Sequence, residues 1–513
     1  MLQGSAHFKH PAGGPYDREL LDSVRPPGWR NPRPRDRYHM LIVGAGPAGL
    51  AAARGAAALG ATVALVERDL LGGDCLNYGC IPSKPLIRTA RVYADMRNAA
   101  NYGACVPNDI HVDFAMVMER MRRIRARVSR VDSAKRLAEI GIDVFFGGAR
   151  FVSGDAVNVD GIRLRFKKAL VATGSRAMLP TIPGLAEAGH LTNETVFDLT
   201  ALPASLLVIG GGPIGCEMAQ ALARFGSRVV IAHSAPLFLP KEERDAAQMV
   251  SDSLARDGVE VHLNTKAVHV KVEGGKRHVE TINDGNVATI VVDHILTGIG
   301  RVPAVGGLDL EAADVAYDAE AGIHVDDFLR TSNRRVYAAG DVCLEHQFVD
   351  TAVASAGLVV RNALLLGRRR LSALTIPWCT YTDPEVAHVG LYVKQARERG
   401  IPVKTYTVPM HEVDRAIADG EEDGFAKIHV RDGTDTILGA TVVARHAGEM
   451  INGISLAMVA GIGLSTVARV IHTYPTQADA IKMAAEAYTR SSASSFGRWL
   501  ARRWINGWTA VKA

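Results

Sequence analysis

The chain has 513 residues, of which 48% are hydrophobic and 22% charged, so it has the composition of an ordinary soluble protein and the length of about three domains. Its formal net charge of +5 is small and spread along the chain, which argues against nucleic acid as a partner. The six cysteines are scattered apart from one pair, Cys75 and Cys80. This usage excludes a secreted disulfide framework and predicts a reducing, cytoplasmic location with one functional pair.

Residues 1–38 are predicted to form an extended N-terminal arm, because prolines are interspersed with arginines and no apolar signal-peptide core is present. The longest apolar stretches, near 40–66 and 453–471, are interrupted by arginine or are rich in glycine and serine. We therefore expect both stretches to be buried α/β segments and not membrane spans.

A dinucleotide-binding unit opens the folded part of the chain. A short apolar strand, 39–43, leads into Gly44-Ala45-Gly46-Pro47-Ala48-Gly49, an alanine-rich helix and a second strand, 62–66, that ends on Glu67. This is G-x-G-x-x-G in its strand–turn–helix setting, with an acid about twenty residues later. The three glycines let the backbone approach a pyrophosphate at the helix N-terminus, and Glu67 can accept hydrogen bonds from ribose hydroxyls.

Cys75 and Cys80 follow this unit. In a regular α-helix the Cα atoms of residues i and i+5 are roughly 8–9 Å apart, and a disulfide tolerates about 7 Å. A bridge between the two cysteines therefore needs a backbone that leaves the helix, which Asn77 and Gly79 permit. The alternatives are two passive buried thiols, or half of a zinc site, which would need a second C-x(2–4)-C that the chain lacks.

The segment 111–140 is predicted to be a long amphipathic helix, because its apolar side chains recur at helical spacing. We interpret its arginines, at positions 120, 122, 123, 125, 127 and 130, as a solvated face and not as a nucleic-acid contact.

A second dinucleotide-binding unit begins at Leu206. The strand 206–209 leads into Gly210-Gly211-Gly212-Pro213-Ile214-Gly215, a helix that contains Glu217, and the strand 228–232. Two units imply two dinucleotides and a relay between a donor and an acceptor. NAD-specific units usually place an acid at the end of the second strand, where this chain has His233. The missing acid favours NADPH, although no arginine clamp for a 2′-phosphate replaces it.

The run Gly72-Gly73-Asp74-Cys75-Leu76-Asn77-Tyr78-Gly79-Cys80-Ile81-Pro82-Ser83-Lys84 resembles the redox-active segment of the class I pyridine nucleotide-disulfide oxidoreductases, the flavoprotein group of dihydrolipoamide dehydrogenase, glutathione reductase and mercuric reductase. The resemblance extends over most of residues 39–490. It implies an α/β fold with two Rossmann-like dinucleotide-binding domains, for FAD and NAD(P), and a C-terminal α+β dimerisation domain. The expected boundaries are 1–38 for an N-terminal extension, 39–185 and 306–375 for the FAD-binding domain, 186–305 for the NAD(P)-binding domain, 376–490 for the dimerisation domain and 491–513 for an amphipathic tail.

By this resemblance the chain passes hydride from NAD(P)H to FAD and then electrons to a Cys75–Cys80 disulfide. Cys80 would contact the flavin as a charge-transfer thiolate, and Cys75 would engage the substrate. The cofactor-binding residues that the resemblance implies, besides the two glycine motifs and Glu67, are Lys84 at the flavin, Glu217 near the flavin–nicotinamide contact, Asp341 on the ribityl chain, and Ala149, Gly174, His233 and Gly300. Members of the family are homodimers, so Tyr474 of one subunit would face the cysteine pair of the other.

Three positions depart from the family pattern. Asp74 stands where members typically have threonine, Tyr474 where disulfide-reducing members have an acid–base histidine, and Asp479 where they have glutamate. A tyrosine, with a pKa near 10, is a poor acid–base at pH 7. In having tyrosine at this site the chain resembles mercuric reductase and its relatives, in which soft metal ions bind to the cysteines. The chain lacks their C-terminal cysteine pair, because no cysteine follows Cys379.

We therefore predict a mercuric-reductase-like enzyme with a small-molecule acceptor, in which Tyr474 and Asp479 complete the cysteine site and no metal is resident. The alternatives are a lipoamide- or glutathione-type disulfide reductase, a quinone-type reductase that does not use the cysteines, and a redox-sensing flavoprotein of low turnover.

The tail 494–513 has an amphipathic pattern. Its large apolar side chains cover about half of a helical circle: Phe496, Trp499, Leu500, Trp504, Trp508 and Val511. Arg498 and Arg502 lie opposite, while Arg503 and Gly507 interrupt the apolar face. A weak interfacial membrane contact and a packed or frayed terminal helix are the two interpretations.

Overall fold

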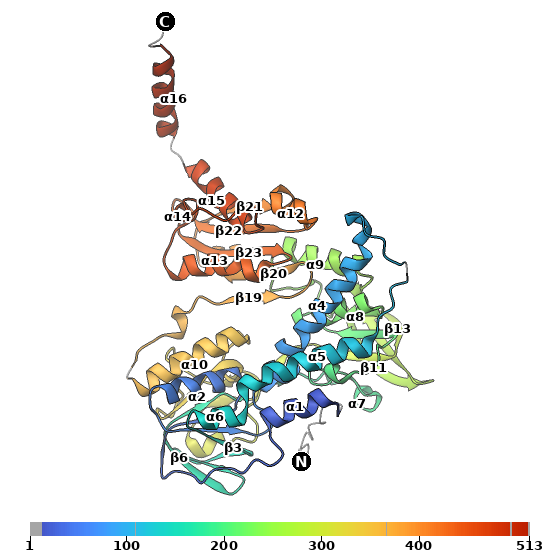
Figure 1. The fold of residues 1–513 in the computed structure, drawn as a ribbon, viewed down its shortest axis with the longest axis vertical. Coiled ribbons are helices and arrows are strands. Elements are labelled where there is room, and N and C mark those ends of the chain that lie inside the picture. Colours follow the sequence, from blue (N-terminus) through green and yellow to red (C-terminus); the bar gives the residue numbers. More distant parts are fainter. Residues whose placement is uncertain (1–12, 108, 366, 493–494, 511–513) are drawn as a thin grey trace. The chain divides into compact units, whose positions relative to one another are not determined.

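The computed structural model describes residues 13–107, 109–365, 367–492 and 495–510. The chain packs as two units: unit 1 contains residues 1–238 and 254–374, and unit 2 contains residues 239–253 and 375–513 (Figure 1). Within the described ranges, no helix combines the length and the apolar character needed to cross a bilayer.

A seven-stranded sheet lies at the centre of unit 1. Its strands are β1 (Tyr38–Val43), β2 (Val63–Glu67), β3 (Ile142–Phe146), β4 (Ala149–Ser153), β5 (Ala156–Val159), β6 (Ile162–Val171) and β18 (Val336–Ala338). The order is β3-β2-β1-β6-β5-β4, with β18 beside β6, and the pairs around β1 are parallel. The residues of β1 and β2 are almost all buried, as expected for parallel strands covered on both faces.

Two helices pack against each other beside this sheet, α2 (Pro47–Ala58) and α10 (Val349–Leu364) (Figure 1). Their contact is made largely by alanine and valine, which belong to one buried cluster with β1 and β2. Small side chains let the α2 backbone lie close to its neighbours, which fixes the N-terminus of α2 at the end of β1.

The second dinucleotide-binding unit forms a separate parallel sheet within unit 1. Its strands, in the order β10-β9-β8-β14, are β8 (Ser205–Ile209), β9 (Arg228–Ala232), β10 (Glu260–His262) and β14 (His294–Thr297). The helix α8 (Pro213–Phe225) connects β8 to β9. Smaller antiparallel pieces complete this part: β11 (Thr265–Glu273), β12 (Lys276–Asn283), β13 (Asn286–Val292), β7 (Ser175–Ala177) paired with β15 (Arg301–Pro303), and β16 (Tyr317–Asp318) paired with β17 (Gly322–Ile323).

The remaining helices of unit 1 include the two that carry the cysteines, α3 (Gly73–Tyr78) and α4 (Cys80–Arg97). The others are α1 (Pro15–Val24), α5 (Phe114–Ser129), α6 (Ala134–Glu139) and α7 (Leu185–Ala188). The long helix expected over 111–140 is thus shorter, because a 3-10 turn at Arg130–Asp132 separates α5 from α6.

The N-terminal arm was wrongly predicted to be extended throughout. Residues 15–24 form α1, which begins with Pro15 at its first turn and buries Leu20 and Val24 in the main core cluster of unit 1. Residues 1–12 lie outside the described part of the chain. The burial of Leu20 and Val24 therefore stabilises a helix within a stretch that is rich in proline and arginine.

Unit 2 is an α+β domain. Its antiparallel sheet, in the order β19-β20-β23-β22-β21, consists of β19 (Pro377–Thr380), β20 (Glu385–Gly390), β21 (Val403–Pro409), β22 (Phe425–Arg431) and β23 (Ile437–Ala444). The helices are α9 (Arg244–Arg256), of which residues 244–253 belong here, α11 (Val393–Glu398), α12 (Asp414–Asp419), α13 (Ala447–Val459), α14 (Leu464–Val467), α15 (Asp479–Ser492) and α16 (Ser495–Ala510). Buried residues of α13 and α15 share one core cluster with the sheet.

The segment 239–253 belongs to unit 2, although it follows the second nucleotide-binding strand in sequence. The Glu242 carboxylate accepts hydrogen bonds from the Tyr392 hydroxyl, at 2.6 Å, and from the Trp378 indole, at 3.2 Å. Glu243 forms an ion pair with Lys427 at 3.0 Å. The sequence-based boundaries place this segment in the NAD(P)-binding domain, whereas its packing partners are in the antiparallel sheet.

Candidate active site

The backbone leaves regular helix between the two cysteines, as predicted. Cys75 lies on α3 and Cys80 is the first residue of α4, and the two helices meet at Gly79. A Cβ atom at Gly79 would lie 3.0 Å from the Asp74 carboxylate and 3.1 Å from the Asp74 carbonyl oxygen, so a side chain here would be a tight fit. Asn77 remains helical, and its buried side-chain amide donates hydrogen bonds to the carbonyls of Leu71 and Gly73.

The two cysteines are free thiols in this structure, and their pKa values differ in direction. Their mutual hydrogen bond raises the pKa of Cys75 and lowers that of Cys80. Burial raises the pKa of both thiols, whereas the ammonium group of Lys84 lowers it. Cys80 begins α4, where the helix dipole and the Lys84 ammonium group both favour a thiolate.

Lys84 and Glu217 meet beside the pair. Lys84 lies one turn after Cys80 on α4, and its Nζ is 3.0 Å from the Glu217 Oε2 on α8. The Glu217 side chain is buried, and the Lys84 side chain is about one-third exposed. Two residues expected at the flavin and at the flavin–nicotinamide contact are thus brought together from separate dinucleotide-binding units.

Asp74 is anchored by two side chains that the sequence did not single out. Its Oδ1 accepts a hydrogen bond from the Asn193 amide at 2.7 Å, and its Oδ2 lies 3.3 Å from the Arg301 guanidinium. The Asp74 charge raises the pKa of both Cys75 and Cys80. The only signal in the sequence was the aspartate itself, at a position where threonine was expected.

Arg301 also reaches the residues near Asp341. Its Nε donates to the Ser175 hydroxyl at 2.8 Å, and that hydroxyl donates to the Asp341 Oδ2 at 2.6 Å. Burial raises the pKa of the Asp341 carboxyl. Asp341 lies directly after β18, so the carboxylate expected on the ribityl chain is joined through Arg301 to the segment that carries the cysteines.

The two glycine motifs have the same backbone geometry. Gly44 and Gly210 have φ values of 100° and 108°, and a Cβ atom at either would lie 2.4 Å from a carbonyl oxygen of the neighbouring strand segment. A Cβ atom at Gly49 or Gly215 would lie 1.8 or 2.4 Å from the carbonyl oxygen of the first glycine. Each helix therefore lies directly against its loop, and no larger residue fits.

Glu67 at the end of β2 and His233 after β9 occupy equivalent positions in the two dinucleotide-binding units. The Glu67 Oε2 accepts a hydrogen bond from the Ala45 N–H at 2.7 Å, and the His233 Nδ1 accepts one from the Gly211 N–H at 3.2 Å. The other ring nitrogen of His233, Nε2, is 3.2 Å from the Leu237 carbonyl oxygen, to which it donates. The His233 ring therefore occupies the place of the expected acid.

The first loop fits FAD. The glycines keep Cβ atoms out of the space beside the loop, and no side chain caps the N-terminus of α2, which leaves its backbone N–H groups to a pyrophosphate. Gly147 donates to the Glu67 carbonyl oxygen at 2.9 Å, which places Ala149, the first residue of β4, close to the end of β2. Gly174 follows β6 at a φ of 71°, and the Gly300 carbonyl accepts from the Met178 N–H.

Tyr474 lies on unit 2 and is strongly exposed, with 69% of its surface accessible. Its hydroxyl donates a 2.8 Å hydrogen bond to the Asp414 Oδ2, and this bond raises the pKa of Tyr474 further. Asp479 begins α15 and accepts a hydrogen bond from the Thr476 N–H at 3.4 Å. Tyr474 is thus held as a hydrogen-bond donor.

Large apolar side chains of unit 2 are exposed in the segments around Tyr474. Those more than one-third exposed on α13 and in the segment that leads to Tyr474 are Leu456, Val459, Ile462, Val470 and Ile471, of which Ile471 is 96% exposed. Exposed apolar residues in this number are typical of a surface that another protein covers.

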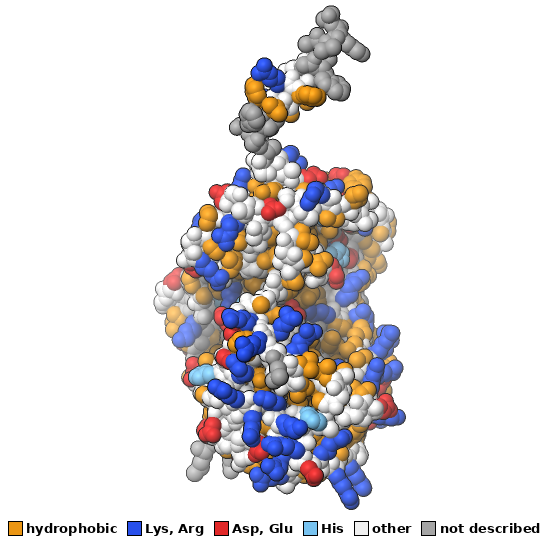
Figure 2. Space-filling view, turned by 90° about the vertical axis from the view of Figure 1, so that its left-hand side faces the viewer, with side chains coloured by type: hydrophobic (Ala, Val, Ile, Leu, Met, Phe, Trp, Pro, Cys, Tyr) orange, Lys and Arg blue, Asp and Glu red, His pale blue; other side chains and the backbone are white. Residues whose placement is uncertain are grey.

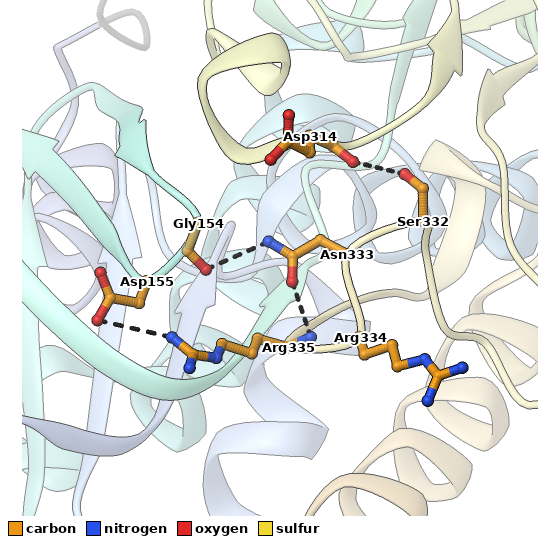
Figure 3. A pocket seen from close by; sticks show the side chains of 7 residues that line it. All are labelled: Gly154, Asp155, Asp314, Ser332, Asn333, Arg334 and Arg335. Atoms are coloured by element: carbon orange, nitrogen blue, oxygen red, sulfur yellow. Dashed lines mark hydrogen bonds and ion pairs between the residues drawn. The ribbon is translucent and has the colours of Figure 1, made fainter.

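A polar hollow of about 480 Å³ lies elsewhere in unit 1 (Figure 3). Its lining groups bond to one another: Asn333 donates to the Gly154 carbonyl, Ser332 donates to the Asp314 carbonyl, and Arg335 pairs with Asp155. None of the predicted site residues lines it. The residues that line the hollow hold these chain segments together, and they do not form a catalytic arrangement.

Comparison with known proteins identifies relatives over most of the chain. The family model for pyridine nucleotide-disulphide oxidoreductases matches residues 38–356, and the model for their dimerisation domain matches residues 376–485. A mercuric reductase of Streptomyces lividans is 34% identical over 458 residues, which cover 88% of this chain and 96% of that protein. A dihydrolipoyl dehydrogenase of Geobacillus stearothermophilus is 33% identical and covers 87% and 95%.

A similar solved structure is the Cu(II) complex of the HOCl-induced flavoprotein disulfide reductase RclA from Escherichia coli. It superposes with a TM-score of 0.78 at 30% sequence identity, over 86% of this chain and 98% of that chain. The predicted fold class, two dinucleotide-binding parts with a dimerisation domain, is confirmed by these matches.

Proposed function

The chain belongs to the pyridine nucleotide-disulphide oxidoreductase family, and we propose that its Cys75–Cys80 pair passes electrons from NAD(P)H, through FAD, to a soft metal ion. The observation that carries this proposal is the geometry of the pair: Cys80 begins α4 beside the Lys84–Glu217 ion pair, and its thiol is hydrogen-bonded to that of Cys75. A pair with one thiolate and one thiol is what the addition of hydride to a disulfide yields, since two electrons and one proton enter.

Each residue of the site then has a role. Bound FAD supplies two-electron transfer between the nicotinamide and sulfur. The loop that begins at Gly44 holds its pyrophosphate, Glu67 a ribose and Asp341 the ribityl hydroxyls. Cys80 keeps the negative charge next to the flavin, because α4 and Lys84 stabilise its thiolate. Cys75 is the outer thiol, which meets the acceptor.

A metal ion suits this site better than a disulfide substrate. Reduction of a disulfide releases a thiolate that an acid must protonate, and Tyr474, held by Asp414, is a weak acid. Reduction of a metal ion needs no such proton. One divalent mercury ion takes both electrons, or two Cu(II) ions take one each, and the cysteines return to a disulfide with release of one proton. Relatives that include mercuric reductases and the Cu(II) complex of RclA support this class of acceptor.

We propose NADPH as the preferred donor. An acid at the position of His233 would repel a 2′-phosphate, whereas an imidazole carries no negative charge. The preference is measured as the ratio of kcat/KM for NADPH to that for NADH.

The enzyme is proposed to act as a homodimer in a reducing, cytoplasmic environment. The dimerisation-domain match and the exposed apolar residues that include Ile471 and Val459 support the dimer. In the dimer, Tyr474 of one subunit would face Cys75 and Cys80 of the other and complete the site.

The test is an anaerobic titration with NADPH while the absorbance is recorded from the visible to the near infrared. A long-wavelength charge-transfer band at two electrons per flavin is expected in the wild type. Cys75→Ser, which cannot form the disulfide, should show the band before NADPH is added and lose it as the flavin is reduced, and Cys80→Ser should lack it throughout. Steady-state turnover with Hg(II), Cu(II), lipoamide, glutathione disulfide and a quinone then identifies the acceptor. Turnover that Cys75→Ser leaves intact would falsify the relay and favour direct flavin chemistry on a quinone.

A further inference from the structure

The last helix, α16, is not used by the proposed chemistry. It has sixteen residues and would be about 24 Å long, which is shorter than the hydrocarbon core of a bilayer. Among the side chains described on it, Trp499, Leu500, Trp504 and Ile505 are 50%, 52%, 71% and 62% exposed. Tryptophan and leucine are normally covered in folded proteins, so a helix that presents four large apolar groups needs an apolar partner.

Three apolar side chains of α16 form one arc, and Ile505 lies about 100° further round the helix. Leu500 and Trp504 are four residues apart and so lie on one face, with Trp499 beside them. Arg503 falls within this arc, and its guanidinium lies over the Trp499 ring, 5.2 Å from the ring centroid. The arginine therefore covers the ring and keeps its charged end at the edge of the face. The side chains of Phe496, Arg498 and Trp508, and residue Val511, fall outside the described part.

The charged side chains at the C-terminal end of the chain are all positive. After Glu486 the sequence contains five cations, Arg490, Arg498, Arg502, Arg503 and Lys512, and no acid. The whole chain has a formal net charge of +5, so residues 1–486 carry equal numbers of cations and acids. On α16 the side chains visible in Figure 2 are apolar or basic, without an acidic one. The partner must therefore be apolar and negatively charged at once.

We propose that α16 docks the enzyme on the surface of an anionic membrane. An acyl–headgroup boundary offers both an apolar layer for Leu500 and Trp504 and negative headgroups for Arg502 and Arg503. A second copy of α16 would bring three more cations, Arg498, Arg502 and Arg503, and repel the first. A nucleic acid would satisfy the arginines but offers no apolar phase for the exposed leucine and isoleucine. The helix lies in the interface plane, because it is too short to span.

The test is flotation of the full-length holoenzyme with vesicles of phosphatidylcholine alone or with about one-third phosphatidylglycerol, at low and high salt. The wild type is expected to float with the anionic vesicles and to be released by salt. Trp499→Ser with Trp504→Ser, and separately Arg502→Gln with Arg503→Gln, should each reduce the bound fraction by about tenfold or more. A chain that ends at residue 493 should not float, and its NADPH-dependent turnover in solution should equal that of the wild type.

Matched controls remove similar groups elsewhere. Val287 is a 63% exposed apolar residue of β13, and Arg123 is an exposed arginine of α5, so Val287→Ser and Arg123→Gln should float as the wild type does. Equal flotation of the full-length and shortened chains would overturn the proposal. Equal binding to neutral vesicles would exclude the anionic surface, and tail-dependent association beyond a dimer, or tail-dependent binding to a DNA duplex without flotation, would assign α16 to a different partner.

Discussion

Asp17 and Arg125 form a buried ion pair that connects α1 to the cysteine segment. The Arg125 Nη2 is 3.1 Å from the Asp17 Oδ1, and both side chains are only 2% exposed. The Arg125 Nη1 donates a 2.9 Å hydrogen bond to the carbonyl of Asn77, which lies between Cys75 and Cys80. Burial lowers the pKa of Arg125, although the Asp17 carboxylate opposes this effect.

The pair allows a quantitative test in a double-mutant cycle. Asp17→Asn leaves the guanidinium buried without its counter-charge and should lower the free energy of unfolding of unit 1 by about 3–5 kcal/mol. Arg125→Met leaves Asp17 with only Arg122, at 4.0 Å, and should have a similar cost, with about 1 kcal/mol more for the hydrogen bond to Asn77. In the double variant both members of the buried pair are neutral, and Arg122 keeps its hydrogen bonds to the carbonyls of Phe197 and Leu199, so the cost should fall to about 2 kcal/mol, far below the sum of the single variants.

Urea unfolding, followed by the fluorescence of released flavin, measures these costs for unit 1. Asp22→Asn is the matched control, because Asp22 is an exposed acid on the same helix, and its effect should stay within about 0.5 kcal/mol. In native protein, Asp17→Asn should also speed alkylation of the cysteine pair by iodoacetamide, since Asn77 loses its anchor. Additive costs in the double variant, or an Asp17→Asn midpoint equal to that of the control, would show that the pair is not energetically coupled.

Three further predictions concern single side chains. Burial lowers the pKa of His388 to about 3, so below its usual value near 6.5 the unfolded chain binds a proton that the folded chain does not. His388 should therefore lower the unfolding free energy of unit 2 by about 2 kcal/mol between pH 7 and pH 5. Urea midpoints of His388→Gln should not show this loss, and a variant with the same pH dependence as the wild type would contradict the prediction. His233→Glu should lower the ratio of kcat/KM for NADPH to that for NADH by about tenfold or more, because the new carboxylate repels a 2′-phosphate; an unaltered ratio means that the ring does not lie at the ribose. Asp74→Thr removes a charge that raises the pKa of Cys75 and Cys80, so the pH midpoint of iodoacetamide alkylation should move to lower pH, while Asp74→Asn tests whether the charge or the hydrogen bond to the side chain is responsible.

The dinucleotide-binding loops could be predicted from the sequence because their geometry is local. Gly44 and Gly210 each adopt a positive φ that favours glycine, and each lies a fixed number of residues from its strand and helix. The break between Cys75 and Cys80 was predicted only for a bridged pair, because helix geometry holds residues five apart too far from each other for a disulfide; the structure has the break with both thiols free.

The missed features depend on partners far away in sequence. Arg125 looked like one more arginine of a solvated face, yet its partner Asp17 is 108 residues distant and both are buried. Arg301 and Asn193 reach Asp74 across more than a hundred residues. A charged side chain has the same appearance in sequence whether water or a buried counter-charge surrounds it, so only the fold distinguishes the two cases.

The position of residues 239–253 in unit 2 has a consequence for synthesis of the chain. Glu243 leaves the ribosome 184 residues before its partner Lys427, which at about 5–20 residues per second is a delay of about 10–40 s. During that interval the parallel sheet of the second nucleotide site can be complete while residues 239–253 have no antiparallel sheet to pack on. Replacement of the region 376–490 by that of a relative would make this permanent, because it would take away the Trp378 indole and the Lys427 ammonium group from the carboxylates of Glu242 and Glu243. The exchangeable module of this enzyme is therefore made of two pieces of chain.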